Sequence, residues 1–89
     1  MPDVKSEKRR EPRAPAEGAV RIVLNQSGAE EIVGRLMDVS ASGFRAAHNH
    51  AALPKGRTVK FQHAAAWGQA RVIWNRITPD AIETGFLIL

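Results

Sequence analysis

The chain has 89 residues and a net charge of +4, from 13 lysines and arginines against 9 acids. This length suits one small domain, which buries only about 60% of its unfolded surface and leaves little room for a deep catalytic cleft. The absence of cysteine excludes disulfides, thiolate metal sites and cysteine nucleophiles, and no apolar run is long enough to span a membrane.

Residues 1–17 are expected to form a flexible arm, because they hold three prolines and show no apolar periodicity. Five cations and four acids are mixed within the arm. A tail that binds any polyanion would not carry so many carboxylates, so particular arginines matter more here than the total charge. The arm also lacks the apolar segment of a signal peptide, and we expect a cytoplasmic protein.

From Gly18 onward, short apolar alternations separated by turn residues predict an all-β domain over residues 18–89. The predicted strands cover residues 19–24, 30–39, 44–47, 57–63, 68–76 and 81–89. Their inward side chains are expected to be Val20, Ile22, Leu24, Ile32, Leu36, Val59, Phe61, Val72, Trp74, Ile82, Thr84, Phe86 and Ile88. Six short strands without a helix to cover them bury their apolar faces by closing into an antiparallel barrel.

Three details of this pattern are less regular. Gly34, in the middle of the second predicted strand, indicates a bulge or a sharp bend. Residues 64–66 could form a helical turn, although it would be too short for a stable helix. Trp67 is expected to be a partly exposed turn residue.

Two short motifs are the strongest local signals. Arg9 and Arg13 stand four residues apart before the first strand, and residues 38–43 place Asp38, Ser40 and Gly43 in a turn between the second and third strands. Each motif is weak alone, because arginine pairs are common and Asp, Ser and Gly populate any turn.

Taken together, with one hairpin between them and a small barrel around them, these motifs resemble the PilZ family of cyclic di-GMP receptors. That family is marked by RxxxR before the first strand and by [D/N]xSxxG between the second and third, and both match here at every defined position. The resemblance covers residues 8–89, and residues 70–74 with residues 85–86 are similar to the family's final strands. It implies a six-stranded PilZ-like barrel that binds cyclic di-GMP.

The resemblance also implies a role for each motif residue, and the chemistry is consistent with it. Arg9 and Arg13 would bind guanine edges and phosphates, because the planar guanidinium can bond O6 and N7 of guanine or two phosphate oxygens. Asp38 would accept from a guanine N1–H and amino group, and the Ser40 hydroxyl both donates and accepts. Gly43 would shape the turn, since it can take a positive φ and lets the ligand approach the backbone.

Four further residues are secondary candidates. Lys8 and Arg10 either touch a phosphate or are solvated, and the sequence favours neither. Arg45 follows the turn and faces either the ligand or, as the favoured alternative, solvent. Trp74 alternates with core positions, so packing inside the barrel is favoured over stacking on a ligand.

Catalysis and metal binding are not expected. His48 and His50 lie on the same side of an extended chain and could supply half of a metal site, but no third ligand is near them in the sequence, and His63 is unplaced. No nucleophile–base pair or paired carboxylates are recognisable. We therefore expect a binding protein without a cofactor rather than an enzyme.

The sequence departs from the PilZ pattern at its end. Many members carry a C-terminal helix over one barrel opening, whereas this sequence stops at Leu89, in or just after the last strand, so this helix is expected to be absent. Either loop side chains close the opening, or a partner or second copy covers it. The apolar residues 86–89 favour an interface, and we expect a monomer or weak homodimer that acts on an unidentified protein partner.

The function expected from this resemblance is that of a stand-alone receptor in which cyclic di-GMP orders the arm. Whether one dinucleotide or a stacked pair binds is left open. Neither a nucleic acid nor a membrane is expected as a partner. Two alternatives remain: a small nucleic-acid-binding barrel, which has the charge but lacks exposed aromatic platforms, and a PilZ-like adaptor that works through protein contacts without the nucleotide.

Overall fold

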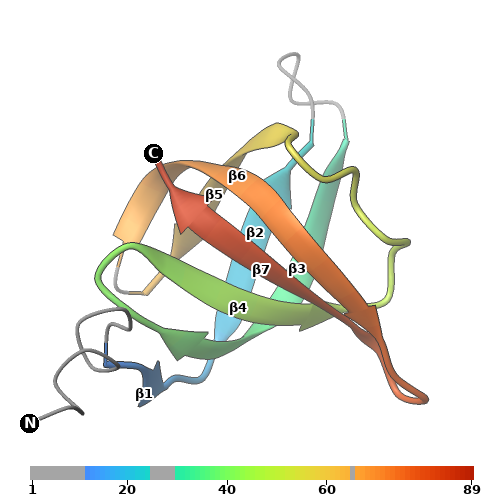
Figure 1. Cartoon of the computed structure of the whole chain (residues 1–89), viewed down its shortest axis with the longest axis horizontal. Helices are drawn as coiled ribbons and strands as arrows, with labels where there is room; N and C mark the ends of the chain where they lie inside the picture. Colours follow the sequence, from blue (N-terminus) through green and yellow to red (C-terminus); the bar gives the residue numbers. More distant parts are fainter. Residues whose placement is uncertain (1–11, 25–29, 65) are drawn as a thin grey trace, which may run out of the picture.

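The computed structural model describes residues 12–24, 30–64 and 66–89, and these form an all-β fold (Figure 1). The strands are β1 (Ala14–Pro15), β2 (Ala19–Val23), β3 (Glu31–Val39), β4 (Gly43–His48), β5 (Thr58–His63), β6 (Ala66–Ile77) and β7 (Ile82–Ile88). Six of them close an antiparallel barrel in the order β3-β2-β5-β6-β7-β4, with β4 pairing back to β3. The predicted barrel is therefore confirmed. The described residues contain no helix long and apolar enough to cross a membrane.

β1 is a strand that the sequence did not predict. Ala14 and Pro15 pair with the end of β3, and the Ala16 amide donates to the Met37 carbonyl at 3.0 Å. β2 pairs further along the same strand, so β1 and β2 follow β3 as one interrupted strand. Residues 12–17 of the predicted arm thus lie along the barrel. Residues 1–11 lie outside the described residues, so the division into arm and barrel stays a prediction.

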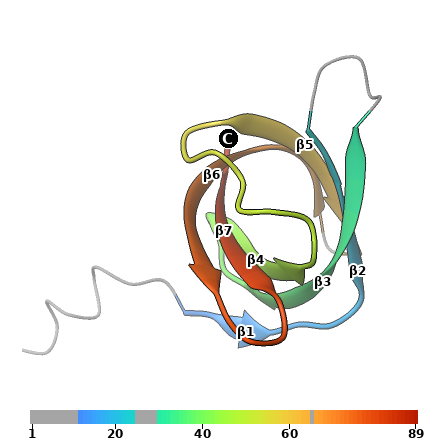
Figure 2. The ribbon, with the colours of Figure 1, turned by 90° about the vertical axis from the view of Figure 1, so that its right-hand side faces the viewer.

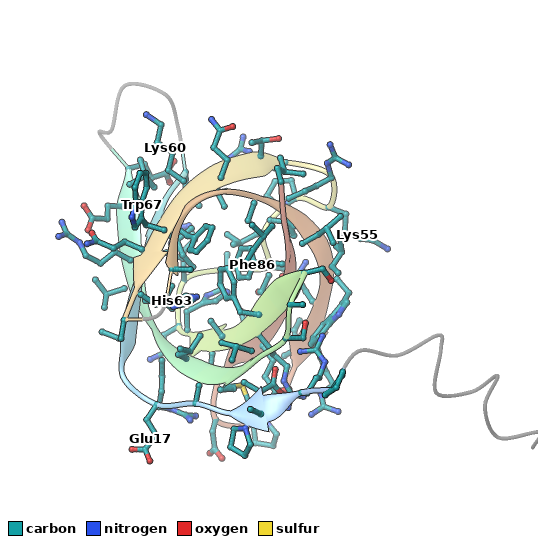
Figure 3. The ribbon with its side chains drawn as sticks, turned by 90° about the vertical axis from the view of Figure 1, so that its left-hand side faces the viewer. Glu17, Lys55, Lys60, His63, Trp67 and Phe86 are labelled. Atoms are coloured by element: carbon teal, nitrogen blue, oxygen red, sulfur yellow. The ribbon has the colours of Figure 1, made fainter. Side chains whose placement is uncertain are left out.

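The core is built from alternate residues of every barrel strand, as the period of two requires. Phe44 lies at its centre, with its ring 4.8 Å from that of Phe61 and 4.7 Å from that of Phe86. In Figure 3, Phe86 points into the barrel. Apart from Trp74 and Ile82, the predicted inward side chains are buried or, as for Ile32 and Ile88, partly buried against this core. Ile82 is partly buried.

The register of β3 shifts at Met37, not at Gly34 as the sequence suggested. Leu36 pairs with Ala46 and Asp38 pairs with Arg45, so two steps along β3 match one step along β4. Glycine is required at position 34 for a steric reason, because a Cβ there would lie 2.7 Å from the Ala47 carbonyl oxygen. Gly34 thus permits the close approach of β4, and the bulge that Met37 forms changes which face of the barrel Asp38 occupies.

A second register shift lies in β6, and it corrects the prediction for Trp74. Val72 pairs with Phe86, but Trp74 pairs with Gly85, which lies between the buried Thr84 and Phe86 and so faces outward. The Trp74 indole occupies the space where a Cβ of Gly85 would stand. Packing of Trp74 inside the barrel was therefore a wrong prediction, because the extra residue turns the indole to the outer face.

The start of β6 also differs from the prediction. Ala66 begins the strand and Ala64 lies in a turn, while residue 65 lies outside the described residues, so the predicted helical turn at 64–66 stays a prediction. Trp67 lies within β6, where it pairs with Gln62, and 80% of its surface is exposed. It is a strand residue on the outer face rather than a partly exposed turn residue.

The segment between β4 and β5 crosses one end of the barrel (Figure 2). Its Leu53 is only 3% exposed, and the Asn75 amide holds both the N–H and the C=O of Leu53, at 3.1 and 2.8 Å. The Thr84 hydroxyl donates to the same Asn75 oxygen at 2.8 Å. A loop side chain therefore covers this end of the barrel.

His48 completes this buried network. The Thr84 hydroxyl uses its hydrogen in the bond to Asn75, so its oxygen accepts a hydrogen bond from His48 Nε2 at 2.8 Å. His48 Nδ1 accepts from the His50 amide at 3.2 Å. Both ring nitrogens are therefore occupied within the protein, and the ring is held as the neutral Nε2–H tautomer.

This network predicts that the barrel loses stability in mild acid. Burial, together with the neighbouring His50, lowers the pKa of His48 below 6.5, and burial lowers the pKa of His63 in the same direction. Below pH 6.5 the unfolded chain therefore binds more protons than the folded one, so stability is complete above that pH and falls as the pH decreases. The urea midpoint should be lower at pH 5.5 than at pH 7.5.

His48→Gln is the matched control, because its amide can still donate to Thr84 but does not titrate. Its midpoint should depend less on pH, with the remaining dependence coming from His63. The same pH dependence in the variant and in the parent would contradict this role for His48.

Candidate functional site

The two register shifts bring four residues of four adjacent strands into one row on the outside of the barrel. Asp38 of β3 pairs with Arg45 of β4, Arg45 pairs with Gly85 of β7, and Gly85 pairs with Trp74 of β6. We call these four residues the outer row. Since Gly85 has no side chain, the Trp74 indole fills the space above it on the outer face of the sheet.

Asp38 is the anionic end of the outer row, and two arginines bind it. Its Oδ1 accepts from Arg13 Nη1 at 2.7 Å, and its Oδ2 accepts from Arg45 Nη2 at 2.6 Å. Asp38 is 8% exposed, whereas the side chain of Arg13 is 47% exposed and that of Arg45 is 32% exposed. The carboxylate is thus covered by guanidinium groups that themselves reach solvent.

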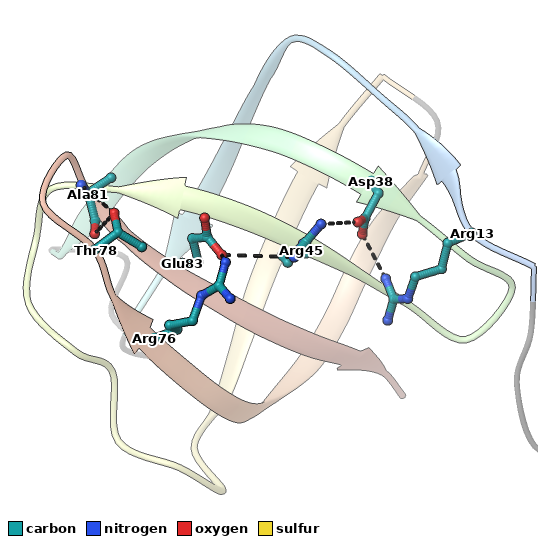
Figure 4. Close-up of polar contacts among 7 residues, drawn as sticks. All are labelled: Arg13, Asp38, Arg45, Arg76, Thr78, Ala81 and Glu83. Atoms are coloured by element: carbon teal, nitrogen blue, oxygen red, sulfur yellow. Dashed lines mark hydrogen bonds and ion pairs between the residues drawn. The ribbon is translucent and has the colours of Figure 1, made fainter.

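The charges continue along the surface in alternation (Figure 4). Glu83 Oε1 lies 3.8 Å from Arg45 Nη1 and 2.8 Å from Arg76 Nη2. Three arginines therefore alternate with two carboxylates, which leaves an excess of one positive charge. The Nε of Arg45 is buried and finds no acceptor among the described residues, so Arg45 is a member of this chain whose hydrogen bonds are incomplete.

The turn after Asp38 is closed by its own backbone. The Ser40 amide donates to the Gly43 carbonyl at 2.8 Å, and its hydroxyl lies 3.4 Å from the same oxygen. Gly43 is not among the described glycines with positive φ, which corrects the predicted reason for a glycine there. A Cβ at Gly43 would instead overlap the Phe86 carbonyl oxygen, so this glycine lets β4 lie against β7.

The structure thus brings some of the predicted site residues together. Arg13 and Asp38 are in contact, Ser40 and Gly43 form the adjoining turn, and Arg45 binds Asp38 instead of facing only solvent. Arg9, Lys8 and Arg10 lie outside the described residues.

Sequence reasoning missed Glu83 and Arg76. The available signal was their place in the last hairpin, where β6 and β7 pair them across from each other. A carboxylate opposite a guanidinium on the exposed side of a hairpin is a common cross-strand pair.

Comparison with known protein families finds no match, and comparison with curated proteins finds no relative. What can be concluded about the site therefore depends on these residues and their geometry.

The arrangement predicts unequal coupling of Asp38 to its two arginines. The Arg13 side chain is about half exposed, so its ion pair should contribute below about 1 kcal/mol. Arg45 is less exposed and makes a charge-assisted hydrogen bond on the barrel wall, so its coupling should reach about 1–2 kcal/mol.

Double-mutant cycles by urea unfolding measure both couplings, with Arg13→Ala, Arg45→Ala and Asp38→Ala alone and in pairs. Arg57→Ala combined with Asp38→Ala serves as a control without contact. A larger coupling for Arg13 than for Arg45, or none for either, would contradict the geometry.

Proposed function

We propose that this barrel is a PilZ-like receptor that binds cyclic di-GMP on the outer row, with Arg13 at one end and Arg9 supplying a second arginine. The observation that supports it is the contact between Arg13 and Asp38. These residues are 25 positions apart and come from the two motifs that resemble the family, yet their side chains meet at 2.7 Å.

The polar groups of the outer row suit the ligand. A cyclic dinucleotide presents guanine N1–H and amino donors to a carboxylate such as Asp38, and O6, N7 and phosphate oxygens to arginines. The ligand would compete with Arg13 and Arg45 for Asp38, and its phosphates would then bind the guanidinium groups released. Charged hydrogen bonds of this kind contribute about 1.5–3 kcal/mol each.

Trp74 adds a flat apolar surface to the same place. Its indole lies outside the barrel over Gly85, which is the cross-strand neighbour of Arg45 in the outer row. Purine rings stack on aromatic side chains and on arginine planes. We therefore assign Trp74 to the proposed site as a stacking residue and leave Ser40 as a hydroxyl beside Asp38.

The proposed response of the protein is local. Residues 14–16 lie along β3, so Arg13 is held close to Asp38 without the ligand. Cyclic di-GMP would add contacts to Arg9 and so fix the preceding residues against the barrel. The new surface would then be read by a protein partner, in the cytoplasm.

Isothermal titration calorimetry with cyclic di-GMP tests the proposal and also gives the number of ligands bound. Arg9→Ala and Arg13→Ala should each weaken binding by at least about tenfold, since about 1.4 kcal/mol corresponds to one decade. Arg57→Ala, which removes an exposed arginine just before β5, is the matched control and should leave the affinity unchanged.

Equal affinity in both arginine variants and in the control would refute the site. No binding to the parent protein would instead favour the adaptor alternative, in which the same barrel acts through protein contacts alone.

A further inference from the structure

A second exposed face lies on β2, β5 and β6, on the other side of the barrel from the contact between Asp38 and Arg45. Figure 3 shows Trp67 and Lys60 pointing outward from it, away from the interior that holds Phe86. We call it the Trp67 face, and its outward side chains are Arg21, Val23, Lys60, Gln62, Trp67 and Gln69.

The side chains of the Trp67 face form two parallel rows across the strands. Arg21, Gln62 and Trp67 are successive cross-strand neighbours in one row. Val23, Lys60 and Gln69 are successive neighbours in the next. Each row therefore places an amide next to a cation, and one row ends on an indole that is 80% exposed.

The charged side chains that β2, β5 and β6 themselves contribute are all cationic, and one acid, Glu31, borders them from β3. β2, β5 and β6 contain no acidic residue, and their cations are Arg21, Lys60, Arg71 and Arg76. The Arg21 guanidinium bonds Glu31 of β3, at 2.7 and 3.3 Å, but its side chain stays 60% exposed. Among the described residues, no carboxylate lies within ion-pair distance of Lys60.

The surface is also hollowed along these rows. A depression of about 530 Å³ is lined by Lys60, Phe61, Gln62, Trp67, Gly68 and Gln69. A second depression of about 220 Å³ adjoins it on Lys60, Phe61 and Gln62 and reaches Arg21 and Val23. The two depressions share three lining residues, and their linings together span β2, β5 and β6, whose outer two strands lie about 10 Å apart by strand spacing.

From this combination we infer that the Trp67 face binds a short stretch of single-stranded nucleic acid. A base stacks on the Trp67 indole, the amides of Gln62 and Gln69 donate to and accept from base edges, and Lys60 and Arg21 bind phosphates. An aromatic platform beside a cationic groove is the arrangement that binds single strands without strong sequence preference.

Other occupants fit this face less well. An acidic peptide would use Lys60 and Arg21 but has no defined group to cover the indole or to pair with two amides. An apolar partner surface would have to bury Gln62, Gln69 and Lys60 around a single tryptophan. This is unfavourable, because their polar groups would lose water without gaining hydrogen-bond partners. The inference does not depend on the proposed function, because it uses none of the residues of the outer row.

Fluorescence anisotropy with a fluorescein-labelled uridine 12-mer RNA tests the inference on the full chain. Trp67→Ala should weaken binding roughly 5- to 150-fold, the range measured when a stacking aromatic is removed. The control is Ile77→Ala, which removes another exposed apolar side chain at the far end of the same strand, and it should bind like the parent. Circular dichroism checks that both variants fold.

A salt titration separates the role of Lys60 from that of Trp67. If Lys60 binds a phosphate, Lys60→Ala should make the slope of log K against log salt shallower by about 0.7, whereas Trp67→Ala should leave the slope unchanged. Excess cyclic di-GMP should not displace the RNA, because the two sites lie on different faces.

No RNA binding by the parent, or equal binding by Trp67→Ala and Ile77→Ala, would overturn the inference. Displacement of the RNA by cyclic di-GMP would show that the RNA binds at the outer row instead. Competition by polyglutamate at equal charge would favour an acidic protein partner. Calorimetry of Trp67→Ala with cyclic di-GMP separates this inference from the proposed function, because the variant should bind cyclic di-GMP like the parent if the two sites are distinct.

Discussion

In a closed barrel every side chain faces either the core or the solvent, and a shift of one residue in strand register exchanges the two. This protein has such a shift at Met37 in β3 and another in β6 between Val72 and Trp74. The first turns Asp38 outward to Arg45. The second turns Trp74 outward and Asn75 inward, where the Asn75 amide holds Leu53 across the barrel end. Both the candidate site and the closed end of the barrel therefore depend on these two bulges.

The alternation of apolar residues was enough to predict the strands and most of the core, because it reflects a period that a half-buried strand must have. It failed at Trp74, since an extra residue in one strand leaves no mark on the hydrophobic pattern. It also missed β1, where Ala14 and Pro15 are exposed and too few to alternate. The sequence suggested a bulge at Gly34 and a positive φ at Gly43, but the structure shows that these glycines give room to the Ala47 and Phe86 carbonyl groups. Gly85 likewise gives room to the Trp74 indole.

The sequence predicted most residues of the candidate site, but not the ion pairs that they form with one another. The two motifs indicated that Arg13 and Asp38 would act together, and the structure joins them directly. No pattern in the sequence indicated that Arg45 would share the same carboxylate, because its contact depends on the register shift at Met37. The charges of these residues largely neutralise one another, so the proposed anionic ligand would have to replace existing ion pairs instead of binding unpaired cations. On the Trp67 face Arg21 also has a carboxylate partner, Glu31, whereas Lys60 has no ion-pair partner among the described residues.

The chain has two tryptophans, one on each of these surfaces, and their indole N–H resonances report on them separately. The most direct test of the account is a ¹H–¹⁵N NMR titration of the full chain with cyclic di-GMP. The account predicts shifts for the Trp74 indole and for the amides of Arg13 and residues 38–43, while the Trp67 indole stays in place. No shifts at the first set, or a shift confined to Trp67, would contradict it.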